Sequence, residues 1–505
     1  MIRLSRRRDE TADQNSDVAL AGRPEDKKYP SRLLIAYGTQ HILTMYGGVI
    51  APPLIVGGAA GLSPADLGLL VTAGLFISGA ATLLQTLGLG PVGARLPIVQ
   101  GISFASVSTM VAVANEGGLQ PVFGSIIVAG LIGLVLSSFF AQLVRLFPPV
   151  VTGTIITVIG LSLMPVAFTW AMGGAGSPSL GSMSNIGLAG LTLVIILVIS
   201  KVFSGAISRL SILIGIVVGT CVGAALGMAD FSRVGTGPVF ALPSLLHFGS
   251  PTFDIAAIVS MTIVILVIMT ETTADLLAIG VVVGRPADRK TVANGLRADT
   301  LSTAVSGGLL NGFPVSAFAQ NVGLVALTGI KSRFVVAVSG GILLILGFFP
   351  QVGAVIAALP LPVLGGAGLA LFGSVAASGI RSLSAVHYEG NQNLVIVALS
   401  IGMGVIPIAV PDFYHAFPSW FQTIFDSGIS AAAVTAVLLN ILFNVLGRKD
   451  AVAPIIAEGP APGVIPEFQP GQHAPHGPGT PSDNGPGEKN DAMGRGPNGP
   501  DPHRH

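Results

Sequence analysis

The chain has 505 residues, of which 51% are hydrophobic and only 10% are charged, and its mean hydropathy is +0.78. A soluble domain carries roughly 25% charged residues, so this composition excludes a soluble enzyme and indicates a polytopic membrane protein. The formal net charge of +1 gives no support for nucleic-acid binding. Cys221 is the single cysteine, which excludes an intramolecular disulfide and a CxxC redox or zinc motif.

Two polar ends flank the apolar region. Arginines and lysines crowd residues 1–31, and residues 448–505 are rich in Pro, Gly and His. Neither end can bury a hydrophobic core, so both are predicted to be disordered tails around a membrane domain at 32–447. The N-terminal stretch lacks the apolar segment of a signal peptide, and its arginine cluster is interpreted as a topology determinant rather than a nucleic-acid-binding arm.

Fourteen segments are predicted to cross the membrane, because roughly 17 to 25 apolar residues span a bilayer and shorter segments broken by Gly or Pro span it as half-helices. They lie at approximately 33–57, 65–89, 97–115, 121–145, 149–171, 184–203, 210–228, 254–283, 293–311, 314–329, 334–357, 362–380, 391–410 and 428–446. Lys and Arg accumulate in the loops after the even-numbered segments, whereas the opposite loops carry only Arg233. By the positive-inside rule, both termini are cytoplasmic and the number of segments is even.

Segments three and ten share a pattern in which a proline is followed by an extended stretch and a polar pair before a short helix. Gln100 in segment three and Gln320 in segment ten lie 220 positions apart, and His41 and Glu271 lie 230 apart. Seven segments per half would place the halves in opposite orientations, and paired broken segments in inverted halves are typical of a transporter's central site. The alternative is that Gly and Pro are simply frequent in membrane helices, which explains one such segment better than a matched pair.

Four polar residues are candidates for a site inside the membrane. Glu271 and Asp275 follow an apolar run and share one helical face, four residues apart. Two carboxylates are costly as anions inside a bilayer, so each is expected to pair, hydrogen-bond or be protonated, and such a group can take up and release a proton. A structural hydrogen bond to a neighbouring segment is the alternative, more so for Asp275. Gln320 and Asn321 place adjacent carboxamides in an apolar stretch, which favours a binding site over hydrogen bonding between helices.

Further candidates have competing structural explanations. Phe104 and Phe318 lie beside the polar pairs, where they can stack on a flat ligand, although an isolated Phe usually faces lipid or the core. His41 is the one histidine in the middle of a segment and suits packing or function equally. Asp299 begins segment nine and can pair with Arg297 or take part in proton coupling. No histidine or cysteine spacing indicates a metal, and no Walker A, GxSxG or HExxH motif points to an enzyme or a cofactor.

The stretch Gln320–Gly329 resembles the signature of the nucleobase-ascorbate transporter family, which reads Gln, Glu or Pro, then Asn, any residue, Gly, four residues, Thr, and Arg, Lys or Gly. The resemblance runs from about 32 to 444 and includes Gln40–His41, Gln100–Phe104 and Glu271–Asp275. It implies an all-α polytopic fold of fourteen transmembrane segments in a seven-plus-seven inverted repeat, with short antiparallel strands in broken segments three and ten.

The same resemblance implies two domains and an assembly. The core domain would comprise segments one to four and eight to eleven, at about 33–145 and 254–357. The gate domain would comprise the remaining segments, at about 149–228 and 362–446. Members of the family are homodimers whose gate domains pair, so a homodimer is expected here.

The resemblance also assigns roles to residues. Those implied in substrate binding are Glu271, Gln320, Phe104, Ala319, Ser103 and Phe318. Those implied in support or proton coupling are His41, Asp275, Asp299, Asn321, Thr328 and Gln100. Glu271 and Gln320 would hold the edge of a nucleobase, and His41 and Asp275 would orient Glu271 or tune its protonation. Asn321 and Thr328 would hold the strand of segment ten.

The first signature position separates substrate branches within the family. Gln, present here as Gln320, is typical of xanthine and uric acid permeases, whereas uracil permeases have Glu and ascorbate carriers have Pro. A carboxamide offers both a donor and an acceptor to the lactam edge of an oxopurine. Ser103 stands where several strict xanthine carriers have Asn. Its shorter side chain leaves room for the C8 oxo group of uric acid, which favours uric acid, alone or with xanthine.

The resulting prediction is a multi-pass proton symporter of the plasma (inner) membrane for uric acid or xanthine, with a purine nucleobase, H⁺ and the lipid bilayer as partners. An elevator-like displacement of the core past the gate would carry the substrate. Na⁺ instead of H⁺ stays an open alternative, as does the preference between the two purines. The rival functions are a uracil or other nucleobase permease and an anion exchanger of the same fold. An exchanger would need a basic residue near the broken segments, and none is found there.

Overall fold

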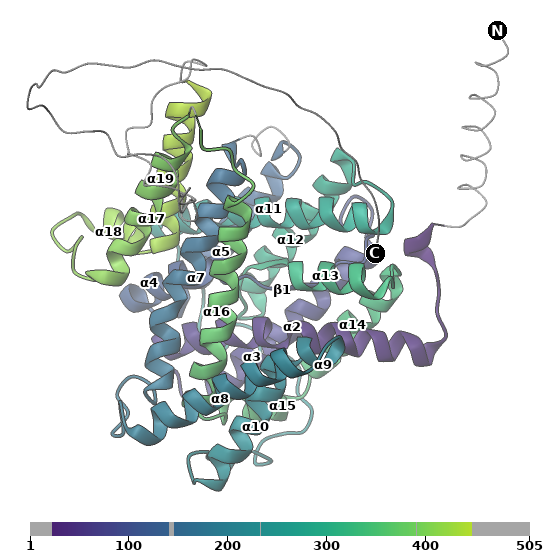
Figure 1. Cartoon of the computed structure of the whole chain (residues 1–505), viewed down its shortest axis with the longest axis vertical. Coiled ribbons are helices and arrows are strands. Elements are labelled where there is room, and N and C mark those ends of the chain that lie inside the picture. Colours follow the sequence, from purple (N-terminus) through teal and green to yellow (C-terminus); the bar gives the residue numbers. More distant parts are fainter. Residues whose placement is uncertain (1–22, 141–145, 233, 390, 447–505) are drawn as a thin grey trace, which may run out of the picture. The chain divides into compact units, whose positions relative to one another are not determined.

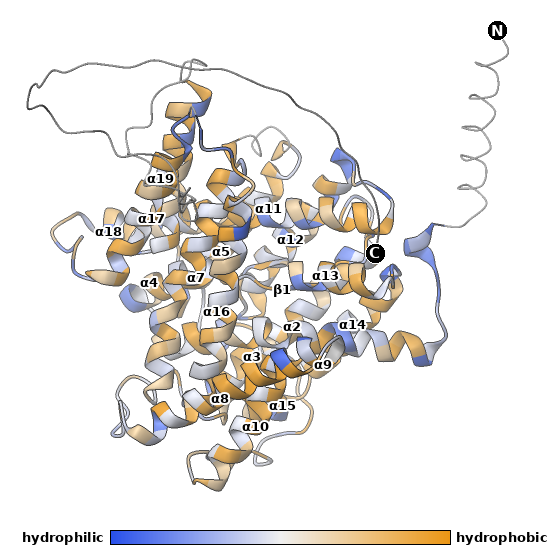
Figure 2. Ribbon diagram, in the orientation of Figure 1, coloured by the Kyte–Doolittle hydropathy of each residue, from blue (hydrophilic) through white to orange (hydrophobic). Residues whose placement is uncertain are grey.

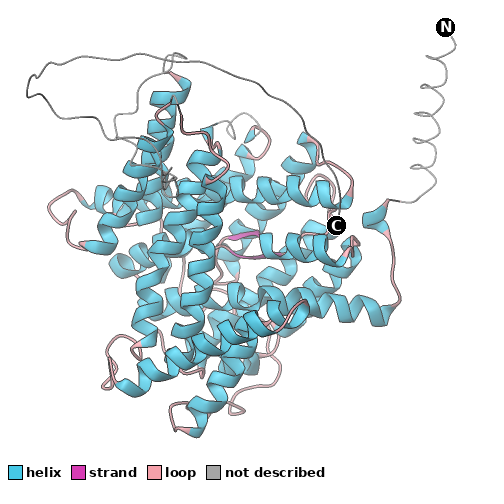
Figure 3. Cartoon of the chain, viewed as in Figure 1, coloured by secondary structure: helices cyan, strands magenta, loops and turns pink. Residues whose placement is uncertain are grey.

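The computed structural model describes residues 23–140, 146–232, 234–389 and 391–446 (Figure 1). The predicted tails at 1–31 and 448–505 lie outside these residues except for 23–31. Helices make up most of the described chain, and the strands within it are β1 (Gln100–Ile102) and β2 (Val315–Ala317) (Figure 3).

The helices follow the apolar segments along the chain. In the first half they are α2 (Ser31–Ala59), α3 (Pro64–Leu87), α4 (Val107–Gly117), α5 (Leu119–Leu136), α7 (Pro149–Ala171), α8 (Met183–Val202), α9 (Ala206–Arg209) and α10 (Ser211–Ala225), with 3₁₀ turns η1 (Pro24–Asp26) and η2 (Phe104–Ser106). In the second half they are α11 (Ile255–Val283), α12 (Arg289–Leu309), α13 (Ala319–Thr328), α14 (Arg333–Leu346), α15 (Pro350–Ala357), α16 (Leu361–Leu383), α17 (Asn393–Ala409), α18 (Ser419–Phe425), α19 (Gly428–Asn440) and the π-helix η4 (Ile441–Val445).

Several of these helices are long and apolar enough to cross a membrane. Within the described ranges there are eight, or nine if α14 and α15, which meet at 82°, form one broken span. The eight are α2, α3, α5, α7, α8, α11, α16 and the stretch from α19 to Val445. Figure 2 shows mostly apolar residues along the helices and hydrophilic residues at η1. The chain is therefore a multi-pass helical membrane protein.

Helix packing divides into two sets. In the first set, α3 packs against α2, α14 and α15, and α5 packs against α11 and α12. In the second set, α16 packs against α7 and α8, and α17 packs against α7 and α19. Glycine permits the closest approaches, because a Cβ on Gly79 of α3 would collide with the backbone of α14 at Leu344, and one on Gly379 of α16 would collide with α7 at Thr157.

The strands β1 and β2 pair antiparallel, with Gly101 opposite Ser316 (Figure 3). Two backbone hydrogen bonds extend the ladder, from Ser103 N to Pro314 O (2.9 Å) and from Phe318 N to the carbonyl of Val99 (3.1 Å). The short helices α4 and α13 follow the strands, so each broken segment is a strand that continues into a half-length helix.

Threonine hydroxyls on three surrounding helices satisfy the outer edges of this small sheet. Thr82 of α3 accepts from Gln100 N (2.9 Å) and donates to Gln100 O (3.2 Å). Thr303 of α12 accepts from Val315 N (3.2 Å), and Thr272 of α11 accepts from Ala317 N (3.2 Å). Open strand edges inside a membrane protein need such partners, because neither lipid nor an apolar core can hydrogen-bond the backbone. The hydroxyls thus allow a two-stranded sheet to lie among helices.

Candidate functional site

The C-terminal half of α11 presents one accessible face. Glu271 and Asp275 on this face are half-buried, and Ala274, Ala278 and Val281 are exposed. Residues at these spacings lie on one side of a helix. Neither carboxylate makes a hydrogen bond or ion pair with the residues that the structure describes. Both carboxylates are therefore available to a ligand or a proton.

The neighbouring helix α13, which packs against α11, also presents an accessible face. Ala319, Gln320, Gly323 and Ala326 are exposed along it. The N–H groups of Asn321 and Val322 donate to Phe318 O, so the backbone donors that the start of α13 offers beside the Gln320 carboxamide are the N–H groups of Ala319 and Gln320. Glu271, Asp275 and Gln320 are thus polar groups on accessible faces of two helices in contact, and these three residues are called the polar face below.

His41 and Asn321 join α2 to α13. The Asn321 side-chain Nδ2 donates to His41 Nδ1 (3.0 Å) and to His41 O (3.1 Å), and both residues are buried. A donor at Nδ1 requires that this nitrogen accepts, which places the imidazole proton on Nε2. His41 therefore contacts the signature asparagine directly and makes no hydrogen bond to Glu271 within the described chain.

Asp299 connects three elements from a buried position on α12. Its carboxylate accepts from the hydroxyl of Thr272 on α11 (2.5 Å) and from Gln85 Nε2 on α3 (3.3 Å). Thr272 also accepts from Ala317 N in β2 (3.2 Å). Asp299 thus positions the threonine that holds both the Glu271 helix and the strand before Gln320.

Local pairing with Arg297 was one of two alternatives for Asp299, and the structure does not show it. The Arg297 guanidinium donates instead to Asn294 Oδ1 (2.9 Å), to Ser138 Oγ (3.0 Å) and to Pro91 O (3.3 Å). Arg297 and Asp299 are two residues apart on α12, which places their side chains on roughly opposite sides of the helix, so the two side chains have separate environments.

Sequence reasoning missed Thr272, Gln85 and the strand-binding threonines. A threonine in a membrane helix commonly bonds to a carbonyl of its own helix, as Thr273 does with Met269 O (2.7 Å). The one feature of the sequence that could have pointed to Thr272 is its position directly after Glu271.

The aromatic candidates are buried beside the strands. The Phe318 ring lies against Gly48 of α2, where a Cβ would be 2.7 Å from the ring Cε1, and it fills the space above Gly101 of β1. The Phe104 ring meets Phe372 of α16 edge-on, with centroids 5.9 Å apart. Both rings therefore pack on protein in this conformation.

The remaining candidates have local partners or none. Ser103 Oγ accepts from Ala105 N (3.3 Å) and caps the turn η2. Thr328 donates to Leu324 O (2.8 Å) at the C-terminus of α13, where Gly329 takes the left-handed conformation (φ +67°). Gln100 is buried, and its carboxamide has no hydrogen-bond partner among the described residues.

A hydroxyl cluster joins the two sets of helices away from the polar face. Thr109 of α4 lies 2.7 Å from Ser427 and 3.2 Å from Ser430, at the start of α19. Ser260, in the N-terminal half of α11, lies 3.0 Å from Ser430. These four residues are called the hydroxyl cluster. It fastens the N-terminal half of α11 to α19, whereas the C-terminal half carries the accessible carboxylates.

No three His, Cys, Asp or Glu side chains come together as metal ligands in the part of the chain that the structure describes. The polar face offers hydrogen-bonding groups, two carboxylates and a helix N-terminus to a polar ligand.

The fold and this site define a membrane permease. Residues 32–413 match a sequence profile described as "Permease family". The chain is 42% identical over 414 residues to the xanthine permease of Bacillus subtilis (strain 168), covering 82% of this chain and 94% of that one. It is 40% identical over 419 residues to the uric acid transporter UacT of Escherichia coli (strain K12), covering 82% and 86%. The chain belongs to the nucleobase-ascorbate transporter family, in its xanthine and uric acid permease branch.

Two solved structures share the fold. The transmembrane domain of the cyanobacterial bicarbonate transporter BicA aligns with a TM-score of 0.53 at 16% identity, covering 83% of this chain and 98% of that one. The overall structure of SLC26A9 aligns with a TM-score of 0.54 at 13% identity, covering 86% and 69%. The relatives by sequence are permeases rather than enzymes, so the chain is a transporter.

Proposed function

We propose that this chain carries purine nucleobases, uric acid or xanthine or both, across the plasma membrane together with H⁺. One observation carries the proposal: Gln320 is exposed at the start of α13, and the half-buried Glu271 lies on the helix packed against it. The names of the relatives support the substrate class, because they are xanthine and uric acid permeases.

The polar face suits the edge of an oxopurine. The Gln320 carboxamide supplies one donor and one acceptor, and Glu271 supplies an acceptor when ionised or a donor when protonated. Backbone groups at Phe104 and Ala319, next to the two strands, complete the set. The small Ser103 side chain leaves space for the C8 oxo group, which favours uric acid with or without xanthine.

Proton coupling rests on the carboxylates. Glu271 and Asp275 have no hydrogen-bond partner within the described chain, and moving two anions across a bilayer is costly. A proton taken up with the substrate removes one of these two negative charges and so lowers the cost. Asp299 is held by Thr272 and Gln85, so we assign it a positioning role beside the two accessible carboxylates.

An elevator-like displacement would complete the cycle. We assign the helices α2–α5 and α11–α15 to a core domain and the others to a gate domain, within fourteen segments in a seven-plus-seven inverted repeat with both termini cytoplasmic. A homodimer would form through the gates. In support, the hydroxyl cluster joins α4 and α11 to α19 at one end of α11, and the polar face is accessible at the other.

The test is uptake of radiolabelled uric acid and xanthine by cells that lack their own carriers, at fixed Na⁺ and with or without a protonophore. Accumulation of either purine that a protonophore abolishes is the expected result. Absence of uptake by protein shown to be in the membrane would contradict the proposal and favour uracil or an anion as the substrate. Accumulation that depends on Na⁺ and resists the protonophore would leave the purine assignment intact and replace H⁺ as the coupling ion.

A further inference from the structure

A polar cavity of about 380 Å³ lies away from the polar face, where the α11–α12 loop meets the start of α14. Its lining residues are Arg23, Asp26, Gly90, Gly93, Ala94, Arg95, Arg285, Asp288, Lys290, Thr291, Asn294 and Arg333. Five of them are cationic and two are acidic. None belongs to the residues assigned to substrate or proton, so the transport site does not account for this cavity.

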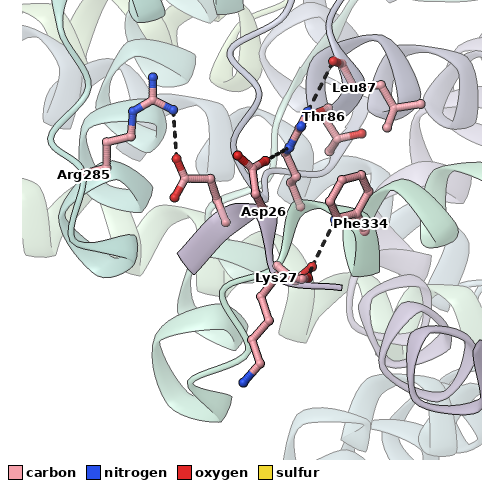
Figure 4. A network of polar contacts seen from close by, with 9 residues as sticks. Asp26, Lys27, Thr86, Leu87, Arg285 and Phe334 are labelled. Atoms are coloured by element: carbon pink, nitrogen blue, oxygen red, sulfur yellow. Dashed lines mark hydrogen bonds and ion pairs between the residues drawn. The ribbon is translucent and has the colours of Figure 1, made fainter. Parts of the chain in front are cut away.

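Two of the five cations are fixed by the turn η1. Arg285 Nη1 lies 2.9 Å from Glu25 Oε1, and Arg333 Nε lies 2.7 Å from Asp26 Oδ1. Figure 4 shows Arg285 at one side of this network and Asp26 near its centre. Arg333 Nη1 also donates to the carbonyl of Thr86 (2.9 Å). These contacts fasten one wall of the cavity to the ends of α3, α11 and α14.

The other three cations have no such partners. The side chains of Arg23, Arg95 and Lys290 are exposed and make no ion pair or hydrogen bond with any residue that the structure describes. Together with Arg285 and Arg333 these residues outnumber Asp26, Asp288 and Glu25, so the cavity has an excess of positive charge. An anion in the cavity would balance that excess.

The backbone adds to the positive potential. Helix α12 starts at this cavity, and the N-terminus of a 21-residue helix favours negative charge. Asp288, its N-cap, is already committed, because its Oδ1 accepts from Thr291 N (2.8 Å). That hydrogen bond, together with the charges of Arg285 and Lys290, lowers the pKa of Asp288.

Two of the lining residues, Gly93 and Arg95, have left-handed backbone conformations. Gly93 (φ +98°) donates from its N–H to Asn294 O on α12 (2.7 Å). Arg95 (φ +57°) extends its side chain over Gly88, where a Cβ would lie 2.7 Å from the guanidinium Nε. A non-glycine residue with positive φ is strained and persists only when its surroundings hold it, so the loop keeps Arg95 at the rim of the cavity.

We propose that this cavity binds a phosphate group, either the headgroup phosphate of an anionic phospholipid or free inorganic phosphate. Guanidinium groups bind phosphate oxygens through paired, charge-assisted hydrogen bonds, and Lys290 adds a point charge at the helix N-terminus. Bound phosphate would bridge the loop before β1, the start of α12 and the N-terminal turn η1. The site is independent of the transported substrate.

The test uses the full-length protein in nanodiscs and measures its melting temperature. One series titrates inorganic phosphate in nanodiscs of phosphatidylcholine, and a second replaces part of the phosphatidylcholine by phosphatidylglycerol without phosphate. Arg95→Gln combined with Lys290→Gln removes two unpaired cations without changing the backbone requirement at position 95. The charge-matched control is Lys201→Gln combined with Arg381→Gln, because both residues are exposed and lie outside the cavity.

Stabilisation of the wild type and the control by phosphate, with apparent affinity about tenfold or more weaker in the Arg95/Lys290 variant, would assign free phosphate. Stabilisation by phosphatidylglycerol alone, lost in the same variant, would assign the lipid headgroup. Equal responses of all three proteins to both ligands, or no response of the wild type to either, would overturn the proposal. If the double variant melts at a much lower temperature without ligand, the single variant Lys290→Gln gives the same comparison with a smaller loss.

Discussion

The two broken segments have the same construction and opposite surroundings. In the first, β1 leads into α4, whose Thr109 is bonded to the serines of α19, and Phe104 packs on Phe372 of α16. In the second, β2 leads into α13, whose residues from Ala319 to Leu327 present an exposed face. The unit of β1 and α4 is therefore closed against the second set of helices, whereas the unit of β2 and α13 has an accessible face.

The largest expected effect comes from removing the charge of Glu271 on the accessible face of α11. Glu271→Gln keeps the shape of the side chain but cannot exchange a proton, so we expect accumulation of purine against a gradient to fall by at least about 100-fold. Radiolabelled uptake measures this. Glu389→Gln, the same change at an exposed loop position, should accumulate purine normally, and wild-type accumulation by Glu271→Gln would refute the coupling role.

Thr272→Val tests whether Thr272 holds the accessible unit of β2 and α13 in place. The substitution removes the hydrogen bonds to Asp299 and to Ala317 N, and unpaired buried groups should cost about 1–3 kcal/mol. The melting temperature in detergent should fall, and purine binding should weaken because β2 precedes Gln320. Thr273→Val is the matched control, since Thr273 bonds to Met269 O in its own helix. Equal losses in the two variants would argue against a special role for Thr272.

Gly48→Ala perturbs the packing between α2 and Phe318. The new Cβ would lie 2.7 Å from the Phe318 ring, so the ring must move and the cost should be about 1–3 kcal/mol. Thermal unfolding measures this, with Gly58→Ala as the control because a Cβ there meets nothing within 4 Å. No difference between the two alanines would mean that the ring does not occupy this position in solution.

The hydroxyl cluster should give the smallest effect, by shifting the balance between states. Thr109→Val removes the hydrogen bonds to Ser427 and Ser430, worth about 1 kcal/mol, and this would change the populations by about fivefold. A cysteine at position 326 on α13, in a Cys221→Ser background, reports accessibility through its rate of maleimide labelling.

Thr109→Val should release the closed unit of β1 and α4 and shift the protein toward the state in which the face of α13 is covered. Labelling at position 326 should therefore slow. Ser374→Ala removes a hydroxyl that bonds to Leu371 O in its own helix and should leave the labelling rate unchanged. A rate that Thr109→Val does not alter would separate the hydroxyl cluster from the conformational equilibrium.

The sequence predicted much of the architecture because lipid imposes strict rules on it. The segment predicted at 149–171 has the bounds of α7, since two prolines mark its start and glycines follow its end. The bend between α14 and α15 and the short helix α18 were not predicted. A proline after two phenylalanines marks a helix start but does not give the angle of the turn.

The sequence singled out candidate site residues but not the contacts between them. Glu271 and Gln320 were singled out because a polar group inside a membrane is costly unless it has a partner or a function. The partners of Asp299 could not be predicted, because Arg297 is near in sequence whereas Thr272 and Gln85 approach only after three helices pack. Likewise, His41 was expected to act on Glu271, and its hydrogen bond to Asn321 depends on how α2 crosses α13.

The most direct test of purine recognition by the accessible unit is binding of uric acid and xanthine to purified wild-type protein and to Gln320→Glu. Replacing the carboxamide by a carboxylate removes the donor and leaves the size unchanged, so purine affinity should fall by about tenfold or more. Competition with uracil should become relatively stronger in the variant. Unchanged affinity for both purines would contradict the assignment of Gln320 to the substrate.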